Sequence, residues 1–254
     1  TNTAVIHDKN QVRIIYATIH LTPPESGGSR EENKKTIKII KKRTREILLK
    51  FARGKKPSGH KERKIYALFP AGSNSKTFAK AADNIRVQYG LKERFEEGVI
   101  RSGAYMKEIK QIFRTHGLPQ DLAYLPHVES SFNIKAYSKF GAAGIWQFTR
   151  STGKQYMRID YVIDERRDPI IAAKAAATFL KANYEALSSW PLAITAYNYG
   201  KAGMLRAVKE KGSYEKIFQS YNRGHFKFAS KNFYSEFLAA REVAKTLEKR
   251  LSYQ

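Results

Sequence analysis

The sequence lacks cysteine altogether and is poor in acidic residues. Without cysteine it can form neither disulfides nor thiolate metal sites, but the compartment stays open because many exported bacterial proteins also lack cysteine. The six histidines show no i, i+4 pair or other spacing that suits metal ligands, so we expect no metal site.

Long hydrophobic runs are also missing. No stretch approaches the roughly 18 to 20 apolar residues that a membrane-spanning helix needs, and we therefore expect a soluble chain. No charged-then-apolar leader follows Thr1, so we expect any export signal to have been removed or to lie outside this sequence. Hydrophobic residues make up 42% of the 254 residues, which is enough for a buried core and too many for general disorder.

The scarcity of acids leaves a large positive charge. The chain has 47 Lys and Arg against 23 Asp and Glu, a formal net charge of +24. This charge favours polyanionic partners such as nucleic acid, anionic lipid or an anionic cell-wall polymer. By itself it does not choose among them.

Residues 4–21 read AVIHDKNQVRIIYATIHL, with β-branched residues on both sides of a polar turn at 8–11. This pattern predicts a β-hairpin. The prolines and glycines of residues 22–30 then predict a break in regular structure.

Residues 30–64 hold 15 Lys and Arg but only 4 acidic residues. Apolar side chains recur there at helical spacing, at Ile37, Ile40, Ile47, Leu48 and Phe51. The pattern predicts a basic amphipathic helix over 31–53. This helix either docks one apolar stripe while its Lys and Arg face water, or presents a surface to an anionic polymer or nucleic acid.

From about residue 77 onward the pattern predicts almost continuous helix, without long strand alternation. Asp168 and Pro169 suit the N-cap and first residue of a helix over 168–187. Pro126 lies inside an earlier helical segment and should kink it near Glu129.

Four stretches in this region occur in a fixed order: GLPQDLAYLPHVESSFN (117–133), AYSKFGAAGIWQF (136–148), DERRDP (164–169) and WPLAITAYNYG (190–200). Together they closely resemble the catalytic domain of family 1 lytic transglycosylases, in particular the membrane-bound lytic murein transglycosylase D-like group. The resemblance covers about residues 85–250. It implies the lysozyme-like SLT fold, which also occurs in goose-type lysozyme.

The resemblance also implies a set of site residues. Glu129 matches the family's single catalytic acid. Ser138 matches the hydroxyl that contacts the sugar near the reacting centre, and Gln147 matches a substrate-contacting glutamine. Tyr197 matches the tyrosine that hydrogen-bonds near the acid, and Asn198 matches the adjoining groove residue.

Two further tyrosines are candidates for substrate binding. Tyr199 stands where a small residue is frequent in the family, and its ring could narrow or re-line a sugar subsite. Tyr234 could reach the cleft from the last helix. The DERRDP stretch, by contrast, is expected to be structural, with Asp168 capping a helix and Arg166 or Arg167 pairing locally.

The residues around Glu129 suit an acid that must stay protonated near neutral pH. A glutamate near a helix end is usually solvated or a capping residue, but this one lies among apolar side chains that could desolvate it. They are Leu122, Tyr124, Leu125, Val128, Phe132, Ile145, Trp146 and Phe148. Tyr197 could hold the carboxyl group by a phenolic hydrogen bond.

A usual glycosidase has two carboxylates, one acid and one nucleophile or base. The acids closest to Glu129 in the sequence are Asp121, Asp160, Asp164 and Glu165. The resemblance implies instead that Glu129 acts twice. It protonates the bridging oxygen between N-acetylmuramic acid and N-acetylglucosamine, then removes the proton of the muramoyl 6-hydroxyl, which closes on C1. No water, metal or organic cofactor is consumed.

We therefore expect a mainly α chain with an N-terminal extension at 1–76 and a lysozyme-like catalytic domain at 77–254. The resemblance implies an exported protein of the periplasm or cell envelope that acts on peptidoglycan strands, without a cofactor or a nucleic-acid partner. The basic zone at 30–64 could add anionic wall polymers or a membrane surface as partners. Two alternatives stay open: a lysozyme-type hydrolase with a preference for modified, for example de-N-acetylated, glycan, and a basic wall- or nucleic-acid-binding protein.

Overall fold

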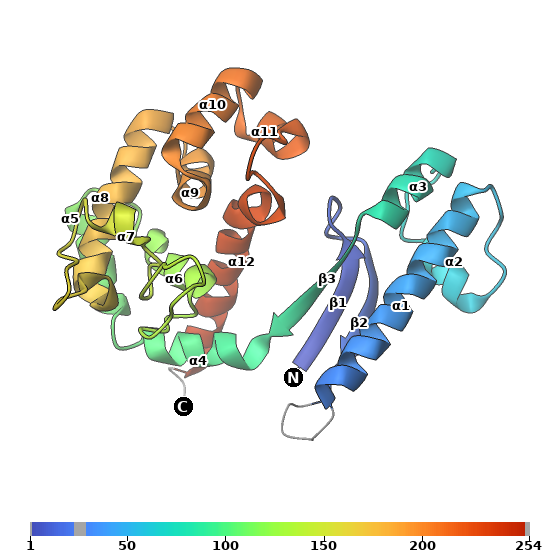
Figure 1. Ribbon diagram of the computed structural model, residues 1–254, viewed down its shortest axis with the longest axis horizontal. Helices are drawn as coiled ribbons and strands as arrows, with labels where there is room; N and C mark the ends of the chain where they lie inside the picture. The colour runs from blue at the N-terminus through green and yellow to red at the C-terminus, as the bar shows by residue number, and fades with distance from the viewer. Residues whose placement is uncertain (1, 23–28, 252–254) are drawn as a thin grey trace. The chain divides into compact units, whose positions relative to one another are not determined.

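A computed structural model describes residues 2–22 and 29–251, and it is mostly helical (Figure 1). The chain divides into two compact units, Thr1–Glu93 and Arg94–Gln254. This boundary lies later in the chain than the division at 76/77 that we expected. The reason is that the helix Ser75–Asp83, which spans residue 76, and the strand Ile85–Leu91 pack into the first unit.

The first unit contains an antiparallel sheet in the order β2-β1-β3. Strand β1 (Asn2–Asp8) pairs with β2 (Ile15–His20), which confirms the predicted hairpin. The Asp8 carboxylate accepts the backbone N–H groups of Asn10 and Gln11, and so stabilises the turn.

Strand β3 (Ile85–Leu91) pairs along the other edge of β1, and it corrects our expectation of continuous helix from residue 77. Ile85 is buried and Val87 packs against the same apolar cluster, whereas Arg86 and Gln88 are more exposed. This alternation has the period of a half-buried strand. It is too short to stand out between two helical patterns.

Helices α1 (Ser29–Ala52), α2 (His60–Tyr66) and α3 (Ser75–Asp83) complete the first unit. Helix α1 confirms the predicted basic helix and packs against α3. Its apolar stripe is buried at Ile37, Leu48 and Phe51, while most of its Lys and Arg are exposed. The break predicted at 22–30 falls largely on residues 23–28, which lie outside the described residues.

The second unit is built from helices and connecting loops. Its α-helices are α4 (Lys92–Ser102, which begins at the boundary), α5 (Met106–Thr115), α6 (Leu125–Glu129), α7 (Arg150–Gly153), α8 (Pro169–Leu187), α9 (Trp190–Tyr199), α10 (Lys201–Lys211), α11 (Tyr214–Ser220) and α12 (Phe228–Leu251). Two 3₁₀ turns, η1 (Gln120–Tyr124) and η2 (Glu165–Arg167), precede α6 and α8. Trp146, Phe113 and Leu180 are fully buried members of its core.

The two prolines of this unit that we singled out both lie in the first turn of a helix. Pro169 begins α8, and Asp168 caps that helix by accepting the N–H groups of Ile170 and Ile171, as predicted. Pro126 does not kink a longer helix, as we expected, because the preceding 3₁₀ turn ends at Tyr124 and α6 starts anew. The missing N–H of Pro126 therefore falls where a helix has unpaired N–H groups anyway.

Within the ranges 2–22 and 29–251, no helix combines the length and hydropathy that crossing a bilayer requires.

Candidate active site

Glu129 is the last residue of α6, and its side chain is half-buried. Burial raises the pKa of its carboxyl group to about 8, and the charge of Glu236 adds to the rise. A group with that pKa is mostly protonated at neutral pH. The site therefore holds a neutral carboxylic acid that can donate a proton.

The apolar surroundings of Glu129 agree with the prediction. The side chains that we expected to desolvate it belong to one core cluster, and all except the half-buried Val128 are buried. Burial in such a cluster disfavours the charged form of a carboxyl group. This is the physical cause of the raised pKa.

Glu236 is the residue that sequence reasoning missed. It lies on α12, which packs against α6, and its side chain is half-buried. A like charge nearby disfavours ionisation of Glu129. The available signal was its helical spacing, because Glu236 lies three residues after the buried Phe233 and next to the buried Phe237.

Tyr197 on α9 lies close to the acid, but its hydroxyl has a different partner from the expected one. The phenol donates to the backbone carbonyl oxygen of Trp146 at 2.7 Å instead of to the Glu129 carboxyl. Burial raises the pKa of Tyr197 well above its usual value, and the charge of Glu129 raises it further. The phenolic oxygen keeps lone pairs that a protonated carboxyl group can approach.

Ser138 and Gln147 lie at the two ends of one loop. The Ser138 hydroxyl accepts the N–H groups of Phe140 at 3.2 Å and Ala142 at 3.0 Å, so its own hydrogen can be donated to a ligand. Gln147 has a left-handed backbone (φ 51°), and its amide nitrogen donates to the Gly144 carbonyl at 2.9 Å. Its side-chain oxygen can therefore accept from a ligand.

Asn198, Tyr199 and Tyr234 are placed differently. Asn198 is exposed, and its side-chain oxygen accepts the hydroxyl of Ser230 at 2.7 Å, which joins α9 to α12. The ring of Tyr199 packs against Phe226 in a separate apolar cluster, and its hydroxyl donates to the backbone of the loop before α12. These contacts give Tyr199 a structural role, and its contact with substrate stays a prediction.

Tyr234 lines a cleft of about 280 Å³, together with Asp121, Trp190, Ile194 and Arg241 among others. The lining of this cleft does not include Glu129, Ser138, Gln147 or Tyr197. This cleft therefore does not support the prediction that Tyr234 lies in the same sugar groove as Glu129.

His127 is a buried titratable group two residues before Glu129. Burial, with the charge of Arg101 in addition, lowers its pKa to about 4, so the ring is neutral at pH 7. It packs among the rings of Phe95, Tyr124 and Phe132. Within the part of the chain that the structure describes, neither ring nitrogen makes a hydrogen bond.

Comparison with known proteins finds similarity within the helical unit. The Transglycosylase SLT domain family matches residues 107–220. Membrane-bound lytic murein transglycosylase D of Escherichia coli (strain K12) is 35% identical over 112 residues, which are 43% of this chain and 25% of that protein. A protein of Alteromonas sp. (strain M-1) named for tributyltin chloride resistance is 34% identical over 110 residues, which are 42% of this chain and 53% of that protein.

The matched region thus spans a quarter of the Escherichia coli protein and about half of the Alteromonas protein. The stretch that matches the family contains Glu129, Ser138, Gln147, Tyr197 and Asn198, and it lies wholly within the second unit. Over residues 107–220 the chain is therefore similar to the Transglycosylase SLT domain family and to a named lytic murein transglycosylase.

Proposed function

We propose that this chain is a peptidoglycan lytic transglycosylase that cleaves the β-1,4 bond between N-acetylmuramic acid and N-acetylglucosamine. One observation carries the proposal: within an SLT domain, burial holds Glu129 as a neutral acid, with a pKa of about 8. Glycosidic bond cleavage needs a proton on the leaving oxygen as positive charge develops on the sugar ring. A carboxyl group with this pKa can supply that proton at pH 7.

The reaction balances with one carboxyl group. Glu129 gives its proton to the bridging oxygen, the bond from that oxygen to the muramoyl C1 breaks, and the sugar ring becomes a cation that its own N-acetyl group can stabilise. The carboxylate of Glu129 then takes the proton of the muramoyl 6-hydroxyl, whose oxygen bonds to C1. The product is a 1,6-anhydro end, and Glu129 is protonated again without consumption of water.

The other site residues would orient the sugar and the acid. Ser138 would donate a hydrogen bond to the sugar near the reacting centre, and Gln147 would accept one through its amide oxygen. Tyr197, fixed on the Trp146 carbonyl, would hold its phenolic oxygen beside Glu129. Asn198 would line the adjoining groove from the end of α9.

A lysozyme-type hydrolase is the second candidate, and Glu236 is the observation that favours it. A hydrolase needs a second carboxylate as nucleophile or as base for water, and Glu236 lies close enough to raise the pKa of Glu129. In the transglycosylase, Glu236 only keeps Glu129 protonated. In a hydrolase, it would take part in the chemistry.

Product analysis separates the two reactions. Purified sacculi are digested, and the released fragments are measured by mass spectrometry. The proposal requires anhydro ends, whereas hydrolysis gives reducing ends that are heavier by one water. If the Glu236→Gln variant still forms anhydro ends, Glu236 is not needed as a second catalytic carboxylate.

We also propose that the basic helix α1 binds anionic polymers of the cell envelope. Lys34, Lys38, Lys41 and Arg45 are exposed along one side of it at helical spacing. Such a row attracts carboxylates or phosphates of an anionic wall polymer or membrane surface, and salt should weaken the attraction. We propose this role for a protein that is exported to the cell envelope. The name of the Escherichia coli relative, a membrane-bound murein transglycosylase, supports that location.

A further inference from the structure

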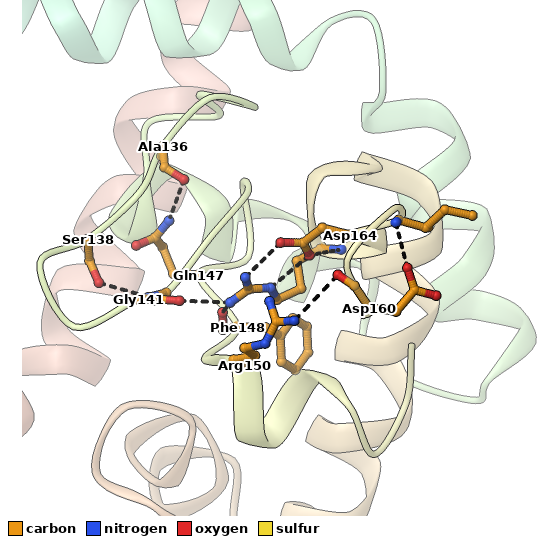
Figure 2. A network of polar contacts seen from close by, with 11 residues as sticks. Ala136, Ser138, Gly141, Gln147, Phe148, Arg150, Asp160 and Asp164 are labelled. Atoms are coloured by element: carbon orange, nitrogen blue, oxygen red, sulfur yellow. Dashed lines mark hydrogen bonds and ion pairs between the residues drawn. The ribbon is translucent and has the colours of Figure 1, made fainter. Parts of the chain in front are cut away.

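Arg166, in the 3₁₀ turn η2, is a buried charge to which the reaction assigns no role. Its side chain is 2% exposed and pairs with the Asp164 carboxylate through two hydrogen bonds, of 2.8 Å and 2.7 Å. Its remaining terminal nitrogen donates to the carbonyl oxygens of Gly141 at 2.7 Å and Phe148 at 3.1 Å. Figure 2 shows this network around Asp164, Gly141 and Phe148.

The two carbonyl groups bracket the loop that carries the proposed sugar contacts. Gly141 belongs to the turn that begins at Ser138, and Phe148 directly follows Gln147. Gly144, between them, lies against the Arg166 backbone, because a Cβ atom at Gly144 would overlap the Arg166 carbonyl oxygen. Gly144 also has a left-handed backbone, with φ of 76°.

The same loop is fixed to the acid on its other side. The Ser130 hydroxyl donates to the Ile145 carbonyl oxygen at 2.9 Å, and Ser130 directly follows Glu129. The Trp146 carbonyl accepts the hydroxyl of Tyr197. The loop therefore connects the Asp164–Arg166 pair on one side to the residue beside Glu129 on the other.

We propose that Arg166, held by Asp164, is a positioning residue that fixes Ser138 and Gln147 relative to Glu129. A guanidinium has five N–H donors in fixed directions, and four of them are used here. Lysine has the charge but lacks this planar set of donors, so it cannot hold the carboxylate and both carbonyl groups together. The inference rests on the proposed function, since it concerns the geometry of that reaction.

A double-mutant cycle distinguishes positioning from a general structural role. Arg166→Lys, Ser138→Ala and the double variant are compared by kcat/KM on soluble glycan fragments. A small displacement of a substrate contact costs about 10²-fold in rate, and we expect a loss of that order for Arg166→Lys. Because Arg166 acts through Ser138, Ser138→Ala should lower kcat/KM much less in the Arg166→Lys background than in the wild type.

The exposed neighbour gives a matched control, since Arg167→Lys makes the same chemical change outside the network. The proposal is overturned if Arg166→Lys keeps wild-type kcat/KM, or if its effect and that of Ser138→Ala multiply independently. Should Arg166→Lys not fold, Asp164→Asn replaces it in the same cycle, because it removes the negative charge that holds Arg166 but leaves the guanidinium itself in place.

Failure of the proposed function would be visible separately. In that case the wild-type protein itself releases no anhydro ends from sacculi. The cycle is therefore also measured as binding of N-acetylglucosamine oligomers by calorimetry, which needs no turnover. Independent effects of the two substitutions on that binding would reject the positioning role even for an inactive protein.

Discussion

Glu129 and Asp164 are both half-buried carboxyl groups of the helical unit, but their pKa values move in opposite directions. Burial and the like charge of Glu236 raise the pKa of Glu129 to about 8. Hydrogen bonds from Arg166 lower the pKa of Asp164, and they outweigh its burial. The comparison shows that partial burial alone does not decide the charge of an acid. The partner that is buried with it does.

The two environments suit two different tasks. Burial and a like charge act on the proposed proton donor, whereas the carboxylate of Asp164 is paired with a buried guanidinium. A buried ion pair of this kind stabilises the fold only when its hydrogen bonds are complete, because charge attraction alone does not offset the cost of desolvation. The pKa of the proposed acid is therefore raised, whereas the pKa of Asp164, the carboxylate proposed to support its loop, is lowered.

The largest effect should come from removing the proton donor. Glu129→Gln keeps the shape of the side chain, so we expect turnover of sacculi to fall by roughly 10² to 10⁴-fold while glycan binding survives. Glu108→Gln, on the exposed face of α5, is the matched control and should keep full activity. Equal turnover by the two variants would show that Glu129 is not the acid.

The same substitution should stabilise the protein, with an effect that depends on pH. The unfolded chain loses the Glu129 proton near the ordinary glutamate pKa of 4.5, but the folded chain keeps it until about pH 8. Folding stability is therefore lost as pH rises through this window, by about 3 kcal/mol at pH 7. Glu129→Gln should recover much of that loss in denaturant unfolding at pH 7, and almost none at pH 4.

His127 should give the opposite pH dependence. Its folded pKa of about 4 lies below the ordinary histidine value of 6.5, so the unfolded chain binds more protons between these values. Stability is then lost as pH falls, by about 2 kcal/mol at pH 5. His127→Phe should flatten the unfolding free energy between pH 7 and pH 5, whereas the same change at the exposed His225 should not.

The smallest effect should come from the carboxylate whose charge acts on Glu129. Glu236→Gln removes a like charge and lowers the pKa of Glu129, so the loss of activity at alkaline pH should begin at a lower pH than in the wild type. Glu242→Gln, an exposed change on the same helix, is the control for the pH–rate profile. An unshifted alkaline limb would mean that Glu236 does not act on Glu129.

Local pattern was enough to predict much of this molecule. The β-branched runs predicted the hairpin, the spacing of Ile37 and Leu48 predicted α1, and Asp168 predicted the start of α8. Strand β3 was not predicted, because its partner β1 lies at the other end of the first unit's sequence. Only the folded chain brings the two strands together.

In the site, too, features with a local cause could be predicted from the sequence, and features that depend on distant residues could not. The apolar stretch around Glu129 was enough to predict a raised pKa, because its cause is largely local in sequence. Helical spacing could place Glu236 near the buried face of α12, but not near Glu129, because that depends on the packing of α12 against α6. The Trp146 carbonyl partner of Tyr197 could not be predicted, because it is a backbone group. A backbone acceptor leaves no residue-specific signal in a sequence.

The most direct measurement is the titration of Glu129 itself, by NMR of protein labelled with ¹³C at the glutamate carboxyl carbons. Comparison with Glu129→Gln assigns the resonance. We predict that Glu129 titrates with a midpoint near pH 8 and is protonated at pH 7. A midpoint near 4.5, the ordinary value for glutamate, would mean that no neutral acid is present and would contradict the account.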